Sequence, residues 1–298
     1  MKSQSLNVSQ TQLEFVNKPT EMICRIINKN IVPLEKRRGR IGYGLVLITR
    51  LHVYEQIKCL DNDLELYRHL QETGIWKELG FESLPDRTQF GRWRRNKAEK
   101  FHEISDNIAD LISEIMGIVE LHTDSTPLDD ETDKESKWGK TSDGWFLGYK
   151  LHATVNQEGF PLRVKVTPGN VYDGPVLPEL VSGLNAAGAI ATGDGAYDSQ
   201  NNKQALRAIG AIPMIARNKR RWGKRRRTPA LCKSLRYKVE QFNSLAKEFM
   251  KERWRRYKGL LNKKGFVYSA VLAMNVIALQ NILKGTIEEA RKISVYWY

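Results

Sequence analysis

The chain has 298 residues, room for one large domain or two ordinary ones, and its 41% apolar content supports a sizeable core. Its one long uncharged apolar run, 266–283, contains one serine and three Asn or Gln residues, so a buried helix is favoured over a membrane span. Three widely separated cysteines without a CxxC pattern fit a reduced, cytoplasmic setting.

The net charge of +14 is concentrated in one segment. Residues 217–264 carry 19 Lys or Arg against three Glu, a local balance of +16. The basic residues run through 217–227 and continue in 251–259, where Trp254 and Arg255 stand among other arginines. Charge this concentrated indicates a polyanionic partner and favours nucleic acid over the alternative, a solvated basic loop. Trp254 and Arg255 are therefore candidate DNA contacts.

The first third of the chain has helical periodicity. Residues 1–17 are expected to be mobile, and 18–117 to form an all-α region that binds DNA. Segments 44–57 and 62–72 have apolar residues at helical spacing, and 100–116 predicts a further helix that leads to the next region.

Segment 84–96 predicts an amphipathic helix. On a helix, Phe90 and Trp93 fall on one side, and arginines spread over the other. This arrangement suits a helix that presents cations to a duplex, although a surface helix with ordinary basic residues is the alternative. The candidate DNA contacts on it are Arg92, Arg94 and Arg95.

From residue 118 the period changes to the alternation of β-strands. The turn signal "NQEGFP" between two alternating segments predicts an antiparallel hairpin. Strands are expected at 118–126, 147–155, 162–167, 189–193 and 211–215, and helices at 175–187, 199–208 and 235–250. This order predicts an α/β fold with a mixed sheet whose first three strands are antiparallel.

Three carboxylates lie at suitable places in this sheet. Asp124 ends the first strand, and Asp194 follows the fourth between Gly193 and Gly195, where an ordinary turn is the alternative interpretation. If the two strands are neighbours, the aspartates stand side by side, and the glycines allow a metal and a phosphodiester to approach closely. Glu240, beside the apolar face of helix 235–250, would complete the set.

Four motifs in this order carry a family resemblance: "HTDSTPL", "GYKLHATVNQEGFPLRVKVTPGNVYDGP", "ATGDGAYDS" and "RYKVEQFNSLAK". The sequence resembles the DDE transposases of bacterial and archaeal insertion sequences, whose catalytic domain is ribonuclease-H-like. The resemblance is strong over 118–283 and looser over 65–95. It implies a ribonuclease-H-like catalytic domain over 118–298 that includes the basic segment.

The resemblance assigns roles to individual residues. It makes Asp124, Asp194 and Glu240 the metal-binding triad, and all-oxygen ligands suit Mg²⁺ or Mn²⁺, with two ions expected. Arg236 and Lys247 match the family's Arg-x3-Glu-x6-Lys and would hold phosphates of the terminal DNA, unless they are simply solvated. Lys150, on the second strand, is a further candidate for a DNA contact. The family's tyrosine has no match, since Lys233 occupies its position and Tyr237 lies in another register.

Other polar residues have structural interpretations. Asp198 is expected to cap helix 199–208, and Asp173 to be a turn or cap residue, with contact behind the triad as the alternative. Asp129 and Asp130 are expected to be solvated, and His122 and His152 to be satisfied structural histidines.

The resemblance implies a transposase that binds terminal inverted repeats, cuts double-stranded DNA and joins it to target DNA. A homodimer on DNA, associated with the nucleoid and not with membranes, is expected. Two alternatives stay open: a ribonuclease-H-like nuclease that cuts without strand transfer, and a DNA-binding relic that has lost catalysis.

Overall fold

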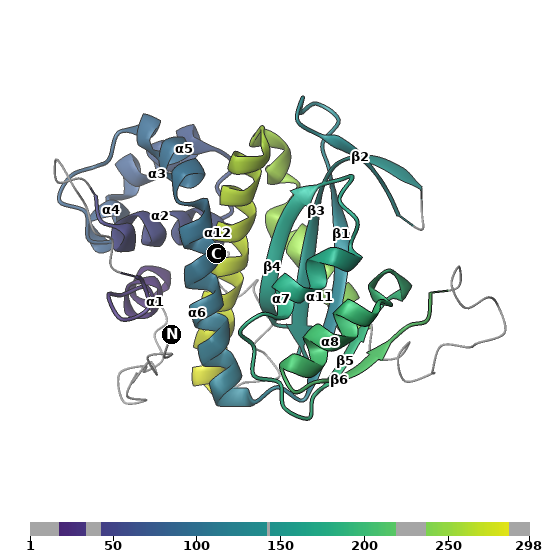
Figure 1. The fold of residues 1–298 in the computed structure, drawn as a ribbon. Coiled ribbons are helices and arrows are strands. Elements are labelled where there is room, and N and C mark those ends of the chain that lie inside the picture. Colours follow the sequence, from purple (N-terminus) through teal and green to yellow (C-terminus); the bar gives the residue numbers. More distant parts are fainter. Residues whose placement is uncertain (1–17, 34–42, 142–143, 219–236, 286–298) are drawn as a thin grey trace. The chain divides into compact units, whose positions relative to one another are not determined.

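A computed structural model of the chain describes residues 18–33, 43–141, 144–218 and 237–285 (Figure 1). The chain divides into two compact units, Met1–Ile108 with Tyr268–Tyr298, and Ala109–Val267. The division falls inside two helices, α6 (Ala98–Met116) and α12 (Leu260–Leu283). The predicted mobile segment 1–17 lies outside the described residues, and the predicted functional division at residue 118 stays a prediction.

The described part of the first unit is helical, as expected. Besides the portions of α6 and α12 that belong to it, its helices are α1 (Pro19–Ile26), α2 (Leu45–Ile57), α3 (Asp63–Thr73), α4 (Ile75–Glu78) and α5 (Arg87–Asn96). The Asn62 side chain accepts hydrogen bonds at the start of α3, and Gly74, at φ 68°, ends it. Helices α1 and α4 were not predicted, because each is too short to show a clear period.

Arg94 on α5 is a buried core residue, so its prediction as a DNA contact is wrong. It is 1% exposed, and its Nη2 lies 2.7 Å from Glu55 Oε1 and 2.6 Å from Asp63 Oδ1. Glu55 on α2 is itself fully buried, and its other oxygen lies 2.8 Å from His52 Nδ1. A buried carboxylate requires a cation, and Arg94 supplies it. Arg92 and Arg95 are exposed on the same helix.

A six-stranded mixed sheet forms the second unit. Its strands are β1 (Glu120–Asp129), β2 (Lys137–Lys140), β3 (Trp145–Asn156), β4 (Pro161–Pro168), β5 (Ile190–Gly193) and β6 (Ile212–Ile215). The order is β2-β3-β1-β5-β6, with β4 also paired to β3. The pairs β1–β3 and β3–β4 are antiparallel, and β1–β5 and β5–β6 are parallel. This confirms the predicted mixed α/β sheet, which is consistent with a ribonuclease-H-like fold; β2 is an addition.

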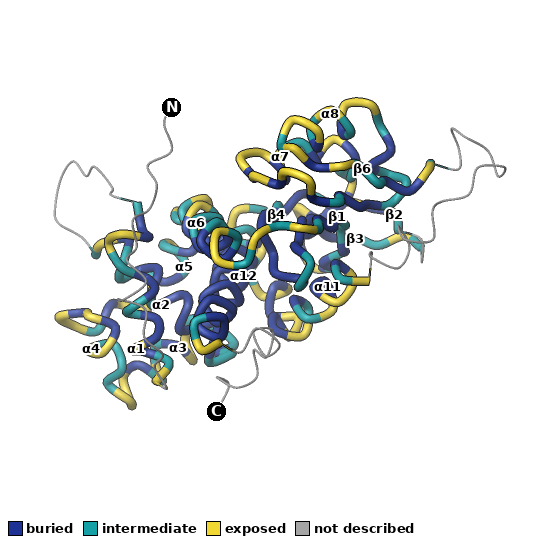
Figure 2. Tube along the Cα trace, turned by 90° about the horizontal axis from the view of Figure 1, so that it is seen from below, coloured by how far each residue is buried: buried dark blue, intermediate teal, exposed yellow. Residues whose placement is uncertain are grey.

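Helices cover both faces of this sheet. In Figure 2, α7 (Leu177–Val181) and α8 (Gln200–Ala208) lie on one side of the strands, and α11 (Tyr237–Met250) lies on the other. The core between the sheet and helices α7 and α8 contains Leu121 and Ala191 from the strands. On the other face α11 packs against β1 and β3. The helix predicted at 175–187 is shorter than expected: a 3₁₀ turn, Gly174–Val176, precedes α7.

Helix α12 contains the long apolar run. Among the residues that the structure describes, it is the one helix long and apolar enough to cross a membrane, yet 94% of its apolar stretch is buried within the protein. Figure 2 shows it buried along nearly its whole length. The prediction of a buried helix over 266–283 is therefore confirmed.

Candidate active site

The register of two parallel strands places Asp124 beside Asp194. Strands β1 and β5 are neighbours, and their last paired residues are Thr123 and Gly193. The next residue in each segment is an aspartate, so the backbones of Asp124 and Asp194 lie side by side, at about the 4.8 Å spacing of adjacent strands. The condition set by the sequence, that these strands be neighbours, is confirmed.

Alternation along the strands decides which face the aspartates occupy. Leu121 and its partner Ala191 point into the core under α7 and α8. Asp124 and Asp194 are three positions further along, so they point to the opposite face of the sheet, which is the face that α11 covers. Asp124 lies within β1 rather than at its end, because β1 continues to Asp129 through its pairing with β3.

Helix α11 brings Glu240 to the same place. Its residues Val239, Phe242 and Phe249 are buried, as the apolar spacing predicted, while Leu245 is half-buried. Glu240 is exposed beside this face and lines the same pocket as the two aspartates.

The three acids share one pocket of about 420 Å³ with three lysines. Its lining is Asp124, Ser125, Thr126, Pro127, Lys140, Thr141, Lys150, Asp173, Asp194, Glu240, Asn243 and Lys247. Apart from the lysine ammonium groups and the amide nitrogen of Asn243, every polar side-chain atom in this lining is an oxygen that could coordinate a metal. Oxygen ligands of this kind are the ones that hard divalent cations such as Mg²⁺ and Mn²⁺ prefer. Over the residues that the structure describes, no three His, Cys, Asp or Glu side chains already form a group that could hold one metal ion.

Two of the lysines are held at the pocket in different ways. Lys150 is 6% exposed and donates to Asp173 Oδ1 at 2.8 Å and to the Val171 carbonyl at 3.0 Å. Lys247 is half-buried, and burial lowers the pKa of its ammonium group, although the carboxylate of Asp129 opposes this shift. The pocket thus has cationic groups close to its carboxylates.

Both strand histidines are buried, but the prediction that both are satisfied holds for His122 and is wrong for His152, whose Nδ1 is buried without a hydrogen-bond partner among the described residues. His122 Nδ1 lies 2.8 Å from the Thr192 hydroxyl, and His152 Nε2 lies 2.8 Å from the Thr167 hydroxyl. Burial lowers the pKa of His152 to about 4, although Asp173, 3.7 Å from its Nδ1, acts in the opposite direction.

Local packing favours glycine on both sides of Asp194, and the close approach of a ligand there stays a prediction. A Cβ on Gly193 would lie 3.1 Å from the Tyr197 ring, and one on Gly195 would lie 3.2 Å from the Arg217 carbonyl oxygen. Asp194 Oδ1 accepts a hydrogen bond from the Ala196 N–H at 2.8 Å. The two small residues therefore let the chain fold closely around a fixed carboxylate.

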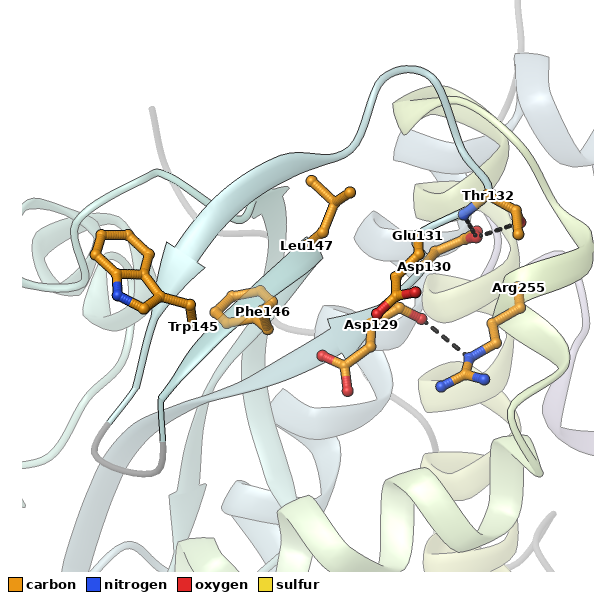
Figure 3. Close-up of a pocket in the computed structure, with 8 residues that line it drawn as sticks. All are labelled: Asp129, Asp130, Glu131, Thr132, Trp145, Phe146, Leu147 and Arg255. Carbon is orange, nitrogen blue, oxygen red and sulfur yellow. Dashed lines mark hydrogen bonds between the residues drawn. The ribbon is translucent and has the colours of Figure 1, made fainter.

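Trp254 is a packing residue, so its prediction as a DNA contact is wrong. It is 4% exposed, and its indole N–H donates to the Asp129 carbonyl at 3.2 Å. Arg255 donates to the same carbonyl at 3.1 Å, while about half of its side chain is exposed (Figure 3). The prediction that Asp130 is solvated is also wrong: it is buried and pairs with Lys263 at 2.7 Å.

Asp198 does not cap α8. Ser199 holds the cap position and accepts from the Asn202 N–H at 3.1 Å, whereas Asp198 is buried and pairs with Lys203. Arg236, Lys233 and most of the basic run 217–227 lie outside the described residues.

Sequence reasoning missed the pocket residues of the β2–β3 hairpin, Lys140 and Thr141, and it also missed Asn243. The signal for the hairpin is present in the sequence as Asp143-Gly144, a common hairpin turn, between two tryptophan-containing segments. Asn243 follows Glu240 by one helical turn, so it belongs to the same helix face.

Comparison with known proteins finds transposases. The family described as "Transposase DDE domain" matches residues 117–276. The transposase for insertion sequence element IS1106 of Neisseria meningitidis serogroup B is 29% identical over 156 residues, which cover 51% of this chain and 54% of that protein. A putative transposase for insertion sequence element IS6501 of Brucella ovis is 46% identical over 52 residues, 17% of this chain and 39% of that protein. The chain thus spans about half or less of these relatives, and no solved structure matches.

Proposed function

The chain belongs to the transposase DDE domain family, and on that premise we propose that it cuts the ends of an insertion sequence and joins them to target DNA. The observation that carries the proposal is the parallel register that places Asp124 beside Asp194, with Glu240 across the same pocket. Both relatives are named as transposases of insertion sequences, which supports terminal inverted repeats as the DNA that is bound.

Asp124, Asp194 and Glu240 would hold Mg²⁺ or Mn²⁺, with two ions expected. When bound, such cations activate the attacking oxygen, from water or a 3′-hydroxyl, and stabilise the departing oxygen in an in-line displacement. With either nucleophile, the same carboxylates would serve cutting and joining.

The cations of the chain itself would place the DNA. Lys150 and Lys247 line the pocket and can pair with non-bridging phosphate oxygens near the scissile bond. The contact of Lys150 with Asp173, which also lines the pocket, would hold the Lys150 ammonium group there. The proposed contacts further along the DNA are Arg236, Arg255, Arg92 and Arg95. A homodimer associated with the nucleoid is part of the same proposal.

The experiment compares metal-dependent cutting and joining by wild type and carboxylate variants. The substrate is a duplex that carries the inverted repeats flanking the gene, with pre-cut ends as a second substrate. Asp194→Asn keeps the acceptor for the Ala196 N–H but removes a charged ligand, so activity should fall by at least about 100-fold while binding persists. Glu240→Gln should lose activity likewise, and Glu248→Gln, an exposed charge on the same helix outside the pocket, should not.

Each alternative gives its own result. Cutting without any joining of pre-cut ends would identify a nuclease, and binding without any metal-dependent chemistry would identify a relic. Equal activity in Asp194→Asn and wild type would exclude the proposed triad. Binding should also weaken steeply with salt, because phosphate contacts release condensed counterions.

A further inference from the structure

The β2–β3 hairpin presents two exposed tryptophans on one face. Trp138 is paired with Leu147, and Lys140 with Trp145, so these four side chains lie on the same side of the hairpin. Trp138 is 61% exposed and Trp145 is 68% exposed. They are diagonal neighbours, a separation of about 7–8 Å that aromatic side chains can bridge. Two large aromatic rings this close together and this exposed require an explanation.

The opposite face of the hairpin is occupied by packing. A Cβ on Gly139 would lie 2.4 Å from the Phe146 ring and 2.4 Å from the Gly169 carbonyl oxygen, so the Phe146 ring lies directly on the glycine backbone. The hairpin is therefore anchored on the Phe146 side, and the tryptophan side is the one left exposed.

The surroundings of the tryptophan face are cationic, and they connect it to the candidate active site. Lys140 Nζ lies 5.4 Å from the centre of the Trp145 ring, whereas Lys137, exposed on the same strand, belongs to the opposite face by alternation. Lys140 and Thr141 line the pocket of the three carboxylates. A ligand on this face would thus continue directly from a phosphate in that pocket.

A second hollow adjoins Trp145. It has a volume of about 330 Å³, with the Trp145 ring at one end and Arg255 at the other (Figure 3). Asp129 and Glu131 also line it, and carboxylates accept hydrogen bonds from the amino groups of bases. In this hollow the Trp145 ring could stack on a base, Arg255 could bind a phosphate, and the carboxylates could accept hydrogen bonds from the base.

We infer that the paired strand segments Lys137–Lys140 and Trp145–Gly148 bind unstacked DNA bases next to the scissile phosphate, through stacking on Trp138 and Trp145. This inference rests on the proposed function and specifies how the DNA end is held. Bases in an intact duplex cover each other's faces, whereas an unpaired base offers its π-face to an aromatic side chain. Lys140 on this face and Arg255 in the adjoining hollow favour a polyanion over a second copy of this basic chain.

The test measures binding of two labelled 20-base-pair duplexes by anisotropy in EDTA, one fully paired and one with a central three-nucleotide mismatch bubble. Wild type should prefer the bubble. Base–aromatic stacking corresponds to a factor of about 5 to about 150 for each ring, so Trp138→Leu with Trp145→Leu should abolish the preference. Leucine keeps an apolar side chain but removes the π-face, and Trp138→Phe with Trp145→Phe should keep most of the preference.

Trp76→Ala is the matched control. Trp76 also stands beside a lysine, with Lys77 Nζ 5.2 Å from its ring centre, but it belongs to the helical unit, and its loss should leave the preference unchanged. A fluorescent 2-aminopurine in the bubble should be quenched by wild type and not by the leucine variant.

Three results would overturn the inference: an unchanged preference in the leucine variant, an equal loss of affinity for both duplexes, or a change in molecular mass that marks the face as a protein interface. Wild type that cuts and joins repeat DNA without preferring the bubble would overturn the inference alone. Wild type that neither binds nor cuts DNA would overturn the proposed function as well.

Discussion

Arg94→Met tests whether this arginine is a core residue or a DNA contact. Methionine retains length and helix propensity but leaves the carboxylate of Glu55 buried without its cation. Removing one partner of a buried ion pair costs about 3–5 kcal/mol. Burial raises the pKa of Glu55, but the charge of Arg94 and the hydrogen bonds from His52 and Arg94 outweigh it and hold the pKa at about 2 against the ordinary 4.5. At 1.36 kcal/mol for each pKa unit, this also corresponds to about 3 kcal/mol.

Urea unfolding followed by circular dichroism measures the loss. Arg92→Met and Arg95→Met, on the exposed side of the same helix, should change the free energy of unfolding by less than about 0.5 kcal/mol. Because the pKa of Glu55 is lowered in the folded state, its contribution is present above pH 4.5 and is lost as the pH falls toward 2. The difference in the free energy of unfolding between wild type and Arg94→Met should therefore become smaller as the pH falls from 4.5 toward 2. A variant of unchanged stability that binds DNA more weakly would refute the reasoning.

Two further predictions concern the sheet. Burial lowers the pKa of His152 to about 4, so the folded protein should lose up to about 3 kcal/mol of stability as the pH falls from 6.5 to 4; urea midpoints across this range should show the loss in wild type and not in His152→Gln. A Cβ on Gly148 would lie 2.3 Å from the Leu128 carbonyl oxygen, so Gly148→Ala should force β1 and β3 apart and cost at least about 2 kcal/mol in thermal unfolding. Gly183→Ala, at φ 77° with open space around it, should cost only about 1 kcal/mol, and equal losses would contradict the steric argument.

Long elements with a clear period could be predicted from the sequence. The helix over 235–250 and the strands over 147–155 and 162–167 were found within a few residues of α11, β3 and β4. The neighbouring position of Asp124 and Asp194 was predicted only on the condition that their strands are neighbours, which β1 and β5 are, although Asp124 lies within β1 and not at its end. The periodic elements depend only on nearby residues, and the pair of aspartates belongs to a set of motifs that occur in a fixed order along the chain.

The errors arose where a residue's role depends on a distant partner. Arg94 and Arg92 lie on one helix and look alike in the sequence, but partners on α2 and α3, Glu55 and Asp63, make Arg94 a core residue. Trp254 stands among arginines, yet its indole N–H contacts the carbonyl of Asp129, 125 positions away. Helical projection ranks side chains by angle, and it cannot show which side of a helix another helix covers.

The hydrogen bond between Asp194 Oδ1 and the Ala196 N–H has a consequence for binding energetics. An exposed aspartate samples several side-chain rotamers, and fixing such a side chain upon binding costs about 0.5–1.5 kcal/mol of conformational entropy. The Asp194 side chain is already restrained by its contact with the Ala196 backbone. This entropy is therefore lost when the protein folds, and not at each encounter with a ligand.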